Sequence, residues 1–119
     1  MNARIKKLWV TALRSGRWVK HMGSLRSADN HRCCLGVLCE VFVDDTSRGG
    51  WNGKIFIDGI DNASGSLPVG VLKWSGLNDE EGDEVQINGE ICKLAKHNDD
   101  RRPRSIPFTE IADAIEEQL

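Results

Sequence analysis

The densest group of side chains with chemical potential lies at residues 31–42, in the run His-Arg-Cys-Cys-Leu-Gly-Val-Leu-Cys-Glu-Val-Phe. With Cys92 and the other histidines, these thiols and imidazoles are numerous enough to bind zinc. Structural zinc sites usually have two to four residues between paired cysteines, so that two thiolates reach one ion. The adjacent Cys33 and Cys34 lack that spacing, and free cysteine is common in protein cores. We therefore expect no metal and no cofactor.

A cysteine nucleophile is a second chemistry for the same run. A thiol at a helix N-terminus has a lowered pKa, and a nearby imidazole can accept its proton. Cys33 or Cys34 could act in this way with His21, His31 or His97. No recognised nucleophile signature surrounds the cysteines, and no Asn or Asp is clearly placed to orient one imidazole. A cysteine-dependent hydrolase stays open as an alternative.

An anion-binding pocket is the interpretation we favour. If a helix begins at Cys33, its first backbone N–H groups are unpaired and attract anions. Arginine binds phosphate through a planar fork, and a tryptophan can stack on a base. Asn98 and Asp99 form either a turn or cap, or a contact to a sugar or base edge. The predicted ligand-binding residues are Arg14, Trp18, Arg26, Arg32, Cys33, Cys34, Asn98 and Asp99. The alternative is a solvated basic surface with the tryptophan in the core.

The distribution of charge supports a local anion site. Residues 1–40 carry eight Lys and Arg against two Asp and Glu, whereas residues 41–119 carry eight against sixteen. The two parts either attract each other or present a basic face to a ligand. Because the whole chain has a net charge of −2, we do not expect it to bind duplex DNA.

Length and composition indicate one compact domain over residues 1–119. No apolar run approaches the roughly 20 residues that span a bilayer, and the N-terminus does not have the pattern of a signal peptide. We therefore expect a cytoplasmic protein with reduced thiols and no membrane contact. Whether it forms a homo-oligomer stays open.

Periodic apolar patterns predict three to four helices packed on a small, mainly antiparallel sheet, an α+β fold. Helices are expected at 2–15, from residue 33 to about 43, after Pro68, and from about residue 107, with a helical turn near residue 94. A strand is the alternative for the second of these. Residues 17–27 should be extended or form an irregular hairpin. Residues 54–57 should form a strand between exposed loops at 48–50 and 58–66. The clearest local signal is Asn88-Gly89 between two alternating segments, which predicts a type I′ hairpin.

One combination of motifs extends over most of the chain. It runs through residues 8–16 and 23–26, is most specific in Cys-Cys-Leu-Gly-Val-Leu-Cys-Glu at 33–40, and continues at 67–68, 74–77, 98–99 and 108–115. This combination resembles a family of small, uncharacterised bacteriophage proteins. Trp18 stands where that family usually has tyrosine, and residues 100–104 are more charged than its pattern. The resemblance implies a phage or prophage source but supplies no known chemistry.

Small phage proteins without an evident catalytic set are often counter-defence factors. Our leading hypothesis is a binding protein that sequesters a small anionic ligand, with a nucleotide signal of host immunity as the expected ligand. The second hypothesis is an inhibitor that binds a host defence protein, such as a CRISPR effector, through the acidic segments 79–90 and 110–117. The cysteine-dependent hydrolase is the third.

Overall fold

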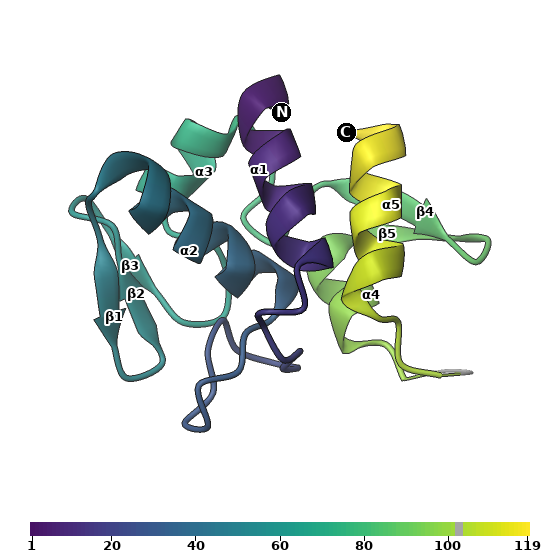
Figure 1. Cartoon of the computed structure of the whole chain (residues 1–119), viewed down its shortest axis with the longest axis horizontal. Helices are drawn as coiled ribbons and strands as arrows, with labels where there is room; N and C mark the ends of the chain where they lie inside the picture. Colours follow the sequence, from purple (N-terminus) through teal and green to yellow (C-terminus); the bar gives the residue numbers. More distant parts are fainter. Residues whose placement is uncertain (102–103) are drawn as a thin grey trace.

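A computed structural model describes residues 1–101 and 104–119, and in that part of the chain it contains five helices and two small antiparallel sheets (Figure 1). The helices are α1 (Ala3–Arg14), α2 (Cys34–Thr46), α3 (Val69–Ser75), α4 (Leu94–Asp99) and α5 (Phe108–Gln118). The strands are β1 (Gly50–Asn52), β2 (Ile55–Ile57), β3 (Asn62–Ala63), β4 (Glu84–Ile87) and β5 (Glu90–Lys93). The α+β class is confirmed, with two separate sheets in place of the one expected.

The central element is α2, which begins after Cys33 and ends at Ser47 in a left-handed conformation. Its residues from Cys34 to Cys39 are all buried, as expected of a helix that is apolar nearly all round. The helix prediction for this run is therefore confirmed over the strand alternative. Gly36 lies so close to the neighbouring loop that an added Cβ would stand 2.0 Å from the carbonyl oxygen of Leu25.

The two amphipathic helices α1 and α5 pack side by side, and α1 also contacts α2 (Figure 1). Both were predicted from their apolar stripes, and both bury them: Ile5, Trp9 and Leu13 in α1 face the core. The side chain of Asn2 caps α1 by accepting a hydrogen bond from the backbone N–H of Ile5. The indole of Trp9 donates to the carbonyl oxygen of Cys34 at 2.9 Å, which fixes α1 against the start of α2.

The first sheet has the order β1-β2-β3, with Trp51 opposite Phe56 and Gly50 opposite Ile57. The strand predicted at 54–57 is confirmed as β2, whose central Phe56 is buried. Strands β1 and β3 were wrongly predicted as loops at Gly50 and at residues 62–63. They are only three and two residues long and rich in Gly and Asn, so their pairing with β2, rather than local propensity, makes them strands.

The second sheet is the predicted hairpin β4–β5. Asn88 and Gly89 have φ values of 53° and 82°, as a type I′ turn requires. The short helix α4 follows β5 directly, and the ring Nε2 of its buried His97 lies 2.8 Å from the carbonyl oxygen of Val85 in β4. The hairpin and α4 therefore pack as one unit beside α5.

The loop between β2 and α3 is held by a buried aspartate. Asp58 is 2% exposed, and its carboxylate accepts hydrogen bonds from the backbone N–H groups of Ile60, Asp61 and Val71 at 2.8, 2.8 and 3.2 Å. Burial by itself would raise its pKa, but the backbone N–H bonds outweigh burial and hold the pKa below its usual value. Gly70 leaves room for this carboxylate, since its Cβ would lie 2.4 Å from Oδ2.

Among the residues described, no helix is long and apolar enough to cross a bilayer.

Candidate functional site

The start of α2 brings together Cys33, Cys34, Asn98 and Asp99, four of the predicted ligand-binding residues. The backbone N–H of Cys34 donates to Asn98 Oδ1 at 3.0 Å, and the N–H of Gly36 donates to the sulfur of Cys33 at 3.3 Å. Asn98 Nδ2 in turn donates to Asp99 Oδ1 at 3.0 Å. These polar groups therefore bond to one another, and the chain itself caps the N–H groups that the sequence suggested for an anion.

The cysteines do not have the environment of nucleophiles. All four are buried, and burial raises the pKa of each thiol, that of Cys33 to about 11. Activation requires the opposite shift. In the described ranges no histidine ring bonds to a cysteine sulfur, and no three His, Cys, Asp or Glu side chains are grouped closely enough to hold a metal ion.

Arg14 lies apart from the other predicted residues. Its guanidinium pairs with Asp113 at 2.7 Å and with Glu116 at 2.9 Å, both on α5. These two carboxylates hydrogen-bond the guanidinium and raise its pKa further. Arg14 thus links α1 to α5, and it does not line the same surface as the other arginines.

The other two predicted arginines, Arg26 and Arg32, form a stack with Arg17 and two tryptophans. We call it the arginine–tryptophan stack, in the order Arg17, Trp18, Arg32, Trp51 and Arg26. The guanidinium carbon of Arg32 lies 4.8 Å from the ring centre of Trp18 and 5.0 Å from that of Trp51. Arg17 lies 4.6 Å from the Trp18 ring and Arg26 lies 5.7 Å from the Trp51 ring. Cation–π attraction of this kind holds residues of the 17–32 segment against β1.

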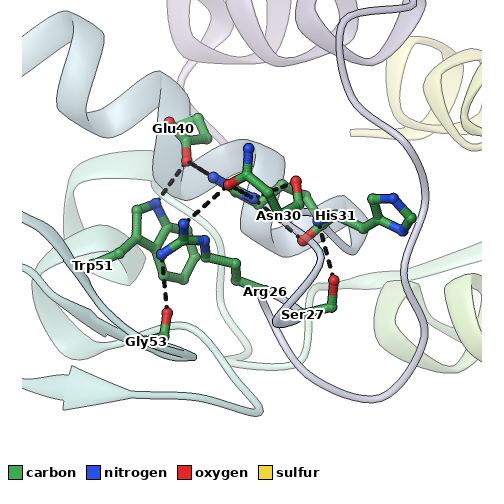
Figure 2. Close-up of polar contacts among 8 residues, drawn as sticks. Arg26, Ser27, Asn30, His31, Glu40, Trp51 and Gly53 are labelled. Atoms are coloured by element: carbon green, nitrogen blue, oxygen red, sulfur yellow. Dashed lines mark hydrogen bonds and ion pairs between the residues drawn. The ribbon is translucent and has the colours of Figure 1, made fainter.

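Glu40 of α2 anchors the centre of this stack (Figure 2). Its Oε1 accepts hydrogen bonds from Arg32 Nε at 2.9 Å and from Trp51 Nε1 at 2.6 Å. Arg32 is only 4% exposed, and its Nη1 also donates to the carbonyl oxygen of Asn30 at 2.8 Å. The charge of Arg32 is therefore neutralised, the Trp51 ring is held by its hydrogen bond to Glu40, and the Trp18 ring packs against the fixed guanidinium of Arg32.

The two outer arginines have no carboxylate partner within the described part of the chain. Arg26 donates to the backbone oxygen of Gly53 at 3.1 Å and to the side chain of Asn30 at 3.0 Å, both neutral groups (Figure 2). The exposed Arg17 makes neither a hydrogen bond nor an ion pair with its guanidinium, and only the Trp18 ring contacts it. With three arginines and one glutamate, the stack carries a net positive charge that is available at Arg17.

A groove of about 350 Å³ lies beside the stack, between α1 and α2. We call it the α1–α2 groove. Its walls are apolar along the two helices, aromatic at Trp18 and charged on both sides. The residues that line it are Leu8, Thr11, Ala12, Ser15, Arg17, Trp18, Glu40, Val41, Asp44 and Asp45. Its volume is within the range of small-molecule sites.

The three carboxylates of the groove differ in how many hydrogen bonds and ion pairs they already form with the rest of the protein. The carboxylate of Asp45 accepts hydrogen bonds from two guanidinium nitrogens of Arg4, at 2.6 and 3.0 Å, and from the indole N–H of Trp74. Glu40 uses Oε1, while its Oε2 accepts no hydrogen bond from residues in the described ranges. Asp44 has no hydrogen-bond or ionic partner among those residues at all. The groove therefore presents an aromatic ring, one available cation and two available acceptors.

Sequence reasoning found Trp18, Arg26 and Arg32 of this region but missed Arg17, Glu40, Asp44 and Trp51. A signal for the two acids was present, because they lie four residues apart in an otherwise apolar run and so share one face of the helix. Trp51 had no such signal, since its strand could not be recognised locally.

Comparisons with known proteins identify a family without an assigned activity. No curated protein and no solved structure matches the chain. The model of one family, described as a domain of unknown function (DUF8296), matches residues 1–119, which confirms the expectation of an uncharacterised family. The chain therefore belongs to the DUF8296 family.

Proposed function

We propose that this protein is a binding protein for a nucleotide-sized ligand, and that the ligand occupies the α1–α2 groove. The observation that carries the proposal is the groove itself, about 350 Å³ in volume, with Trp18 and the unpaired Arg17 in its wall. A planar base can stack on the indole and a phosphate can bind the guanidinium. The buried, high-pKa thiols give no support to a hydrolase.

Stacking of a base on Trp18 requires that Arg17 move. Arg32 already contacts this ring and is fixed by Glu40, whereas Arg17 is exposed and held by the ring alone. An exposed cation–π contact contributes about 0.5–1 kcal/mol, and base–aromatic stacking about 1–3 kcal/mol. A base can therefore displace Arg17 from the ring. The freed guanidinium then remains within reach of the phosphate attached to that base.

The resemblance to phage-encoded proteins supports a role for this binding in counter-defence. In that role the protein would sequester a nucleotide signal of host immunity rather than cleave it. Native mass spectrometry of the protein purified from phage-infected, defence-active cells, followed by denaturation, would test this role. We expect release of one nucleotide-sized mass per chain, and a protein that carries no small molecule would contradict sequestration.

The binding site is tested by calorimetric titration with nucleoside monophosphates and the matching nucleosides. We expect Trp18→Ala to weaken nucleotide binding by roughly tenfold or more, and Trp18→Tyr to retain it. We expect Arg17→Ala to weaken the binding of nucleotides by several-fold, because the phosphate contact is lost. Nucleosides should bind equally or slightly more tightly, because the base no longer has to displace the guanidinium from the Trp18 ring.

Arg48→Ala is the matched control, since Arg48 is also exposed and also lies over an aromatic ring, that of Phe42, but does not line the groove. It should bind like the native chain. The proposal fails if no nucleotide binds, or if Trp18→Ala and Arg48→Ala behave alike in folded protein.

A second candidate function is inhibition of a host defence protein through an acidic surface. The two acidic segments lie side by side, since the side chain of Gln118 on α5 exchanges hydrogen bonds with the backbone of Gln86 in β4. Glu84 and Glu117 on this surface form no ion pair with other described residues. Binding to a defence effector that survives Trp18→Ala but is lost on Glu84→Lys and Glu117→Lys would favour this candidate over the first.

A further inference from the structure

The acceptors in the α1–α2 groove limit which base the site can take. Glu40 and Asp44 lie one helical turn apart on the face of α2 that lines the groove. Carboxylates accept hydrogen bonds and cannot donate them when ionised. A base that enters the groove and stacks on Trp18 therefore meets acceptors on the α2 side, and its edge must offer donors.

Guanine is the common base that meets this requirement best. Its Watson–Crick edge carries two adjacent donors, N1–H and the 2-amino group, which match the two oxygens of one carboxylate. Adenine presents an unprotonated N1 next to its amino group, and that nitrogen would face a carboxylate with no hydrogen between them. Cytosine has the same defect at N3, and uracil offers only one donor between two carbonyl groups.

We infer that the α1–α2 groove selects guanine mononucleotides, and that Asp44 reads the Watson–Crick edge of the base. This inference rests on the proposed function. Asp44 suits the role because its carboxylate has no partner among the described residues, so no existing bond must break. The free Oε2 of Glu40 remains as an acceptor for a ribose hydroxyl, in an orientation that Arg32 and Trp51 hold through Oε1.

The same carboxylates restrict the number of phosphates. Of the three acids that line the groove, Glu40 is paired with Arg32 and Asp45 with Arg4, which leaves Asp44 as the unpaired acid and Arg17 as the one lining cation. A chain of phosphates inside the groove would therefore have one cation to bind and would also approach the negative charge of Asp44. A single phosphate bound at Arg17, which belongs to both the groove and the stack, limits this repulsion. The site therefore fits a mononucleotide better than an oligonucleotide or a nucleoside triphosphate.

The test is calorimetric titration of the native chain and of Asp44→Asn with GMP, IMP and AMP. IMP keeps N1–H and lacks the 2-amino group, so the native chain should bind in the order GMP, IMP, AMP, with roughly tenfold or more between the first and the last. Asp44→Asn should weaken the binding of GMP by about tenfold and leave the binding of AMP unchanged or tighter, because an amide can both donate and accept hydrogen bonds. Glu117→Gln is the control: it removes the same charge from an exposed residue of α5, and it should keep the native order.

The possible results separate the two levels of the argument. If AMP binds the native chain as tightly as GMP, or if Asp44→Asn leaves the ratio of the two affinities unchanged, guanine selection by Asp44 is overturned while nucleotide binding stands. If none of the three nucleotides binds, the proposed function is refuted and this inference with it.

Discussion

The buried pair of Arg32 and Glu40 makes the strongest prediction for the stability of the site. Arg32 is 4% exposed and the side chain of Glu40 is 16% exposed, so neither charge can be fully hydrated if the other is removed. Removing one partner of a buried ion pair typically costs about 3–5 kcal/mol. Since Arg32 keeps its bonds to Asn30, while Trp51 also loses an acceptor, we expect Glu40→Ala to lower the free energy of unfolding by about 3–4 kcal/mol.

Urea unfolding followed by tryptophan fluorescence measures this loss. Glu40→Gln keeps an oxygen acceptor and should cost less than Glu40→Ala. The double variant Arg32→Met with Glu40→Leu removes both charges and replaces them with apolar groups, so it should be more stable than the sum of its two single variants predicts. Strict additivity, or a loss below about 0.5 kcal/mol for Glu40→Ala, would refute the view that this pair holds the stack together.

Three further predictions concern the core and its titrating groups. In a thermal melt, Gly36→Ala should unfold at least about 10 °C below the native chain, because its Cβ would overlap the carbonyl oxygen of Leu25. The control is Gly65→Ala, which has open space around the added Cβ. Equal melting temperatures of the two variants would contradict the close approach of Gly36 to Leu25. The pKa of Asp58 is lower in the folded protein than in the unfolded chain, so the stability it contributes is complete above the unfolded pKa and is lost as pH falls through the folded pKa. Between pH 6 and pH 3, the Asp58→Asn variant should therefore lose less stability than the native chain. Parallel pH profiles of the two proteins would exclude this linkage. The thiol of Cys33, with a pKa of about 11, should react with Ellman's reagent at pH 8 only as fast as the protein unfolds, whereas fast stoichiometric labelling of the native state would show that it is accessible and ionised.

The sequence predicted best the elements that local patterns specify. The apolar stripes of α1 and α5 and the Asn88-Gly89 turn depend on residues close in the chain, and the structure confirms all three. Strand β1 depends instead on pairing with β2, and its sequence, Gly-Trp-Asn, carries no strand signal of its own. The short strands were missed because their cause is tertiary.

The same distinction between local and tertiary causes applies to the candidate site. Arg32 and Trp18 were expected near each other, and they are in contact. Arg14 was placed with them from its position in the sequence, but its side chain projects towards α5, where two acids pair with it. Sequence proximity gave no information about the side of α1 on which this arginine lies. Asn98 was expected next to the start of α2 and does lie there, as its cap rather than in an open pocket.

The bonding state of the polar groups separates structural residues from candidates for binding. Buried polar groups in a stable fold are satisfied, and Arg32, Asn98 and Asp58 each have several partners. Arg17 and Asp44, which line the groove, have no such bonds to other described residues. Groups of this kind are common on protein surfaces, and alone they indicate nothing. Here they share one groove with the Trp18 indole, which packs against Arg32, a side chain that Glu40 fixes, so a ligand could bond them without disturbing the fold.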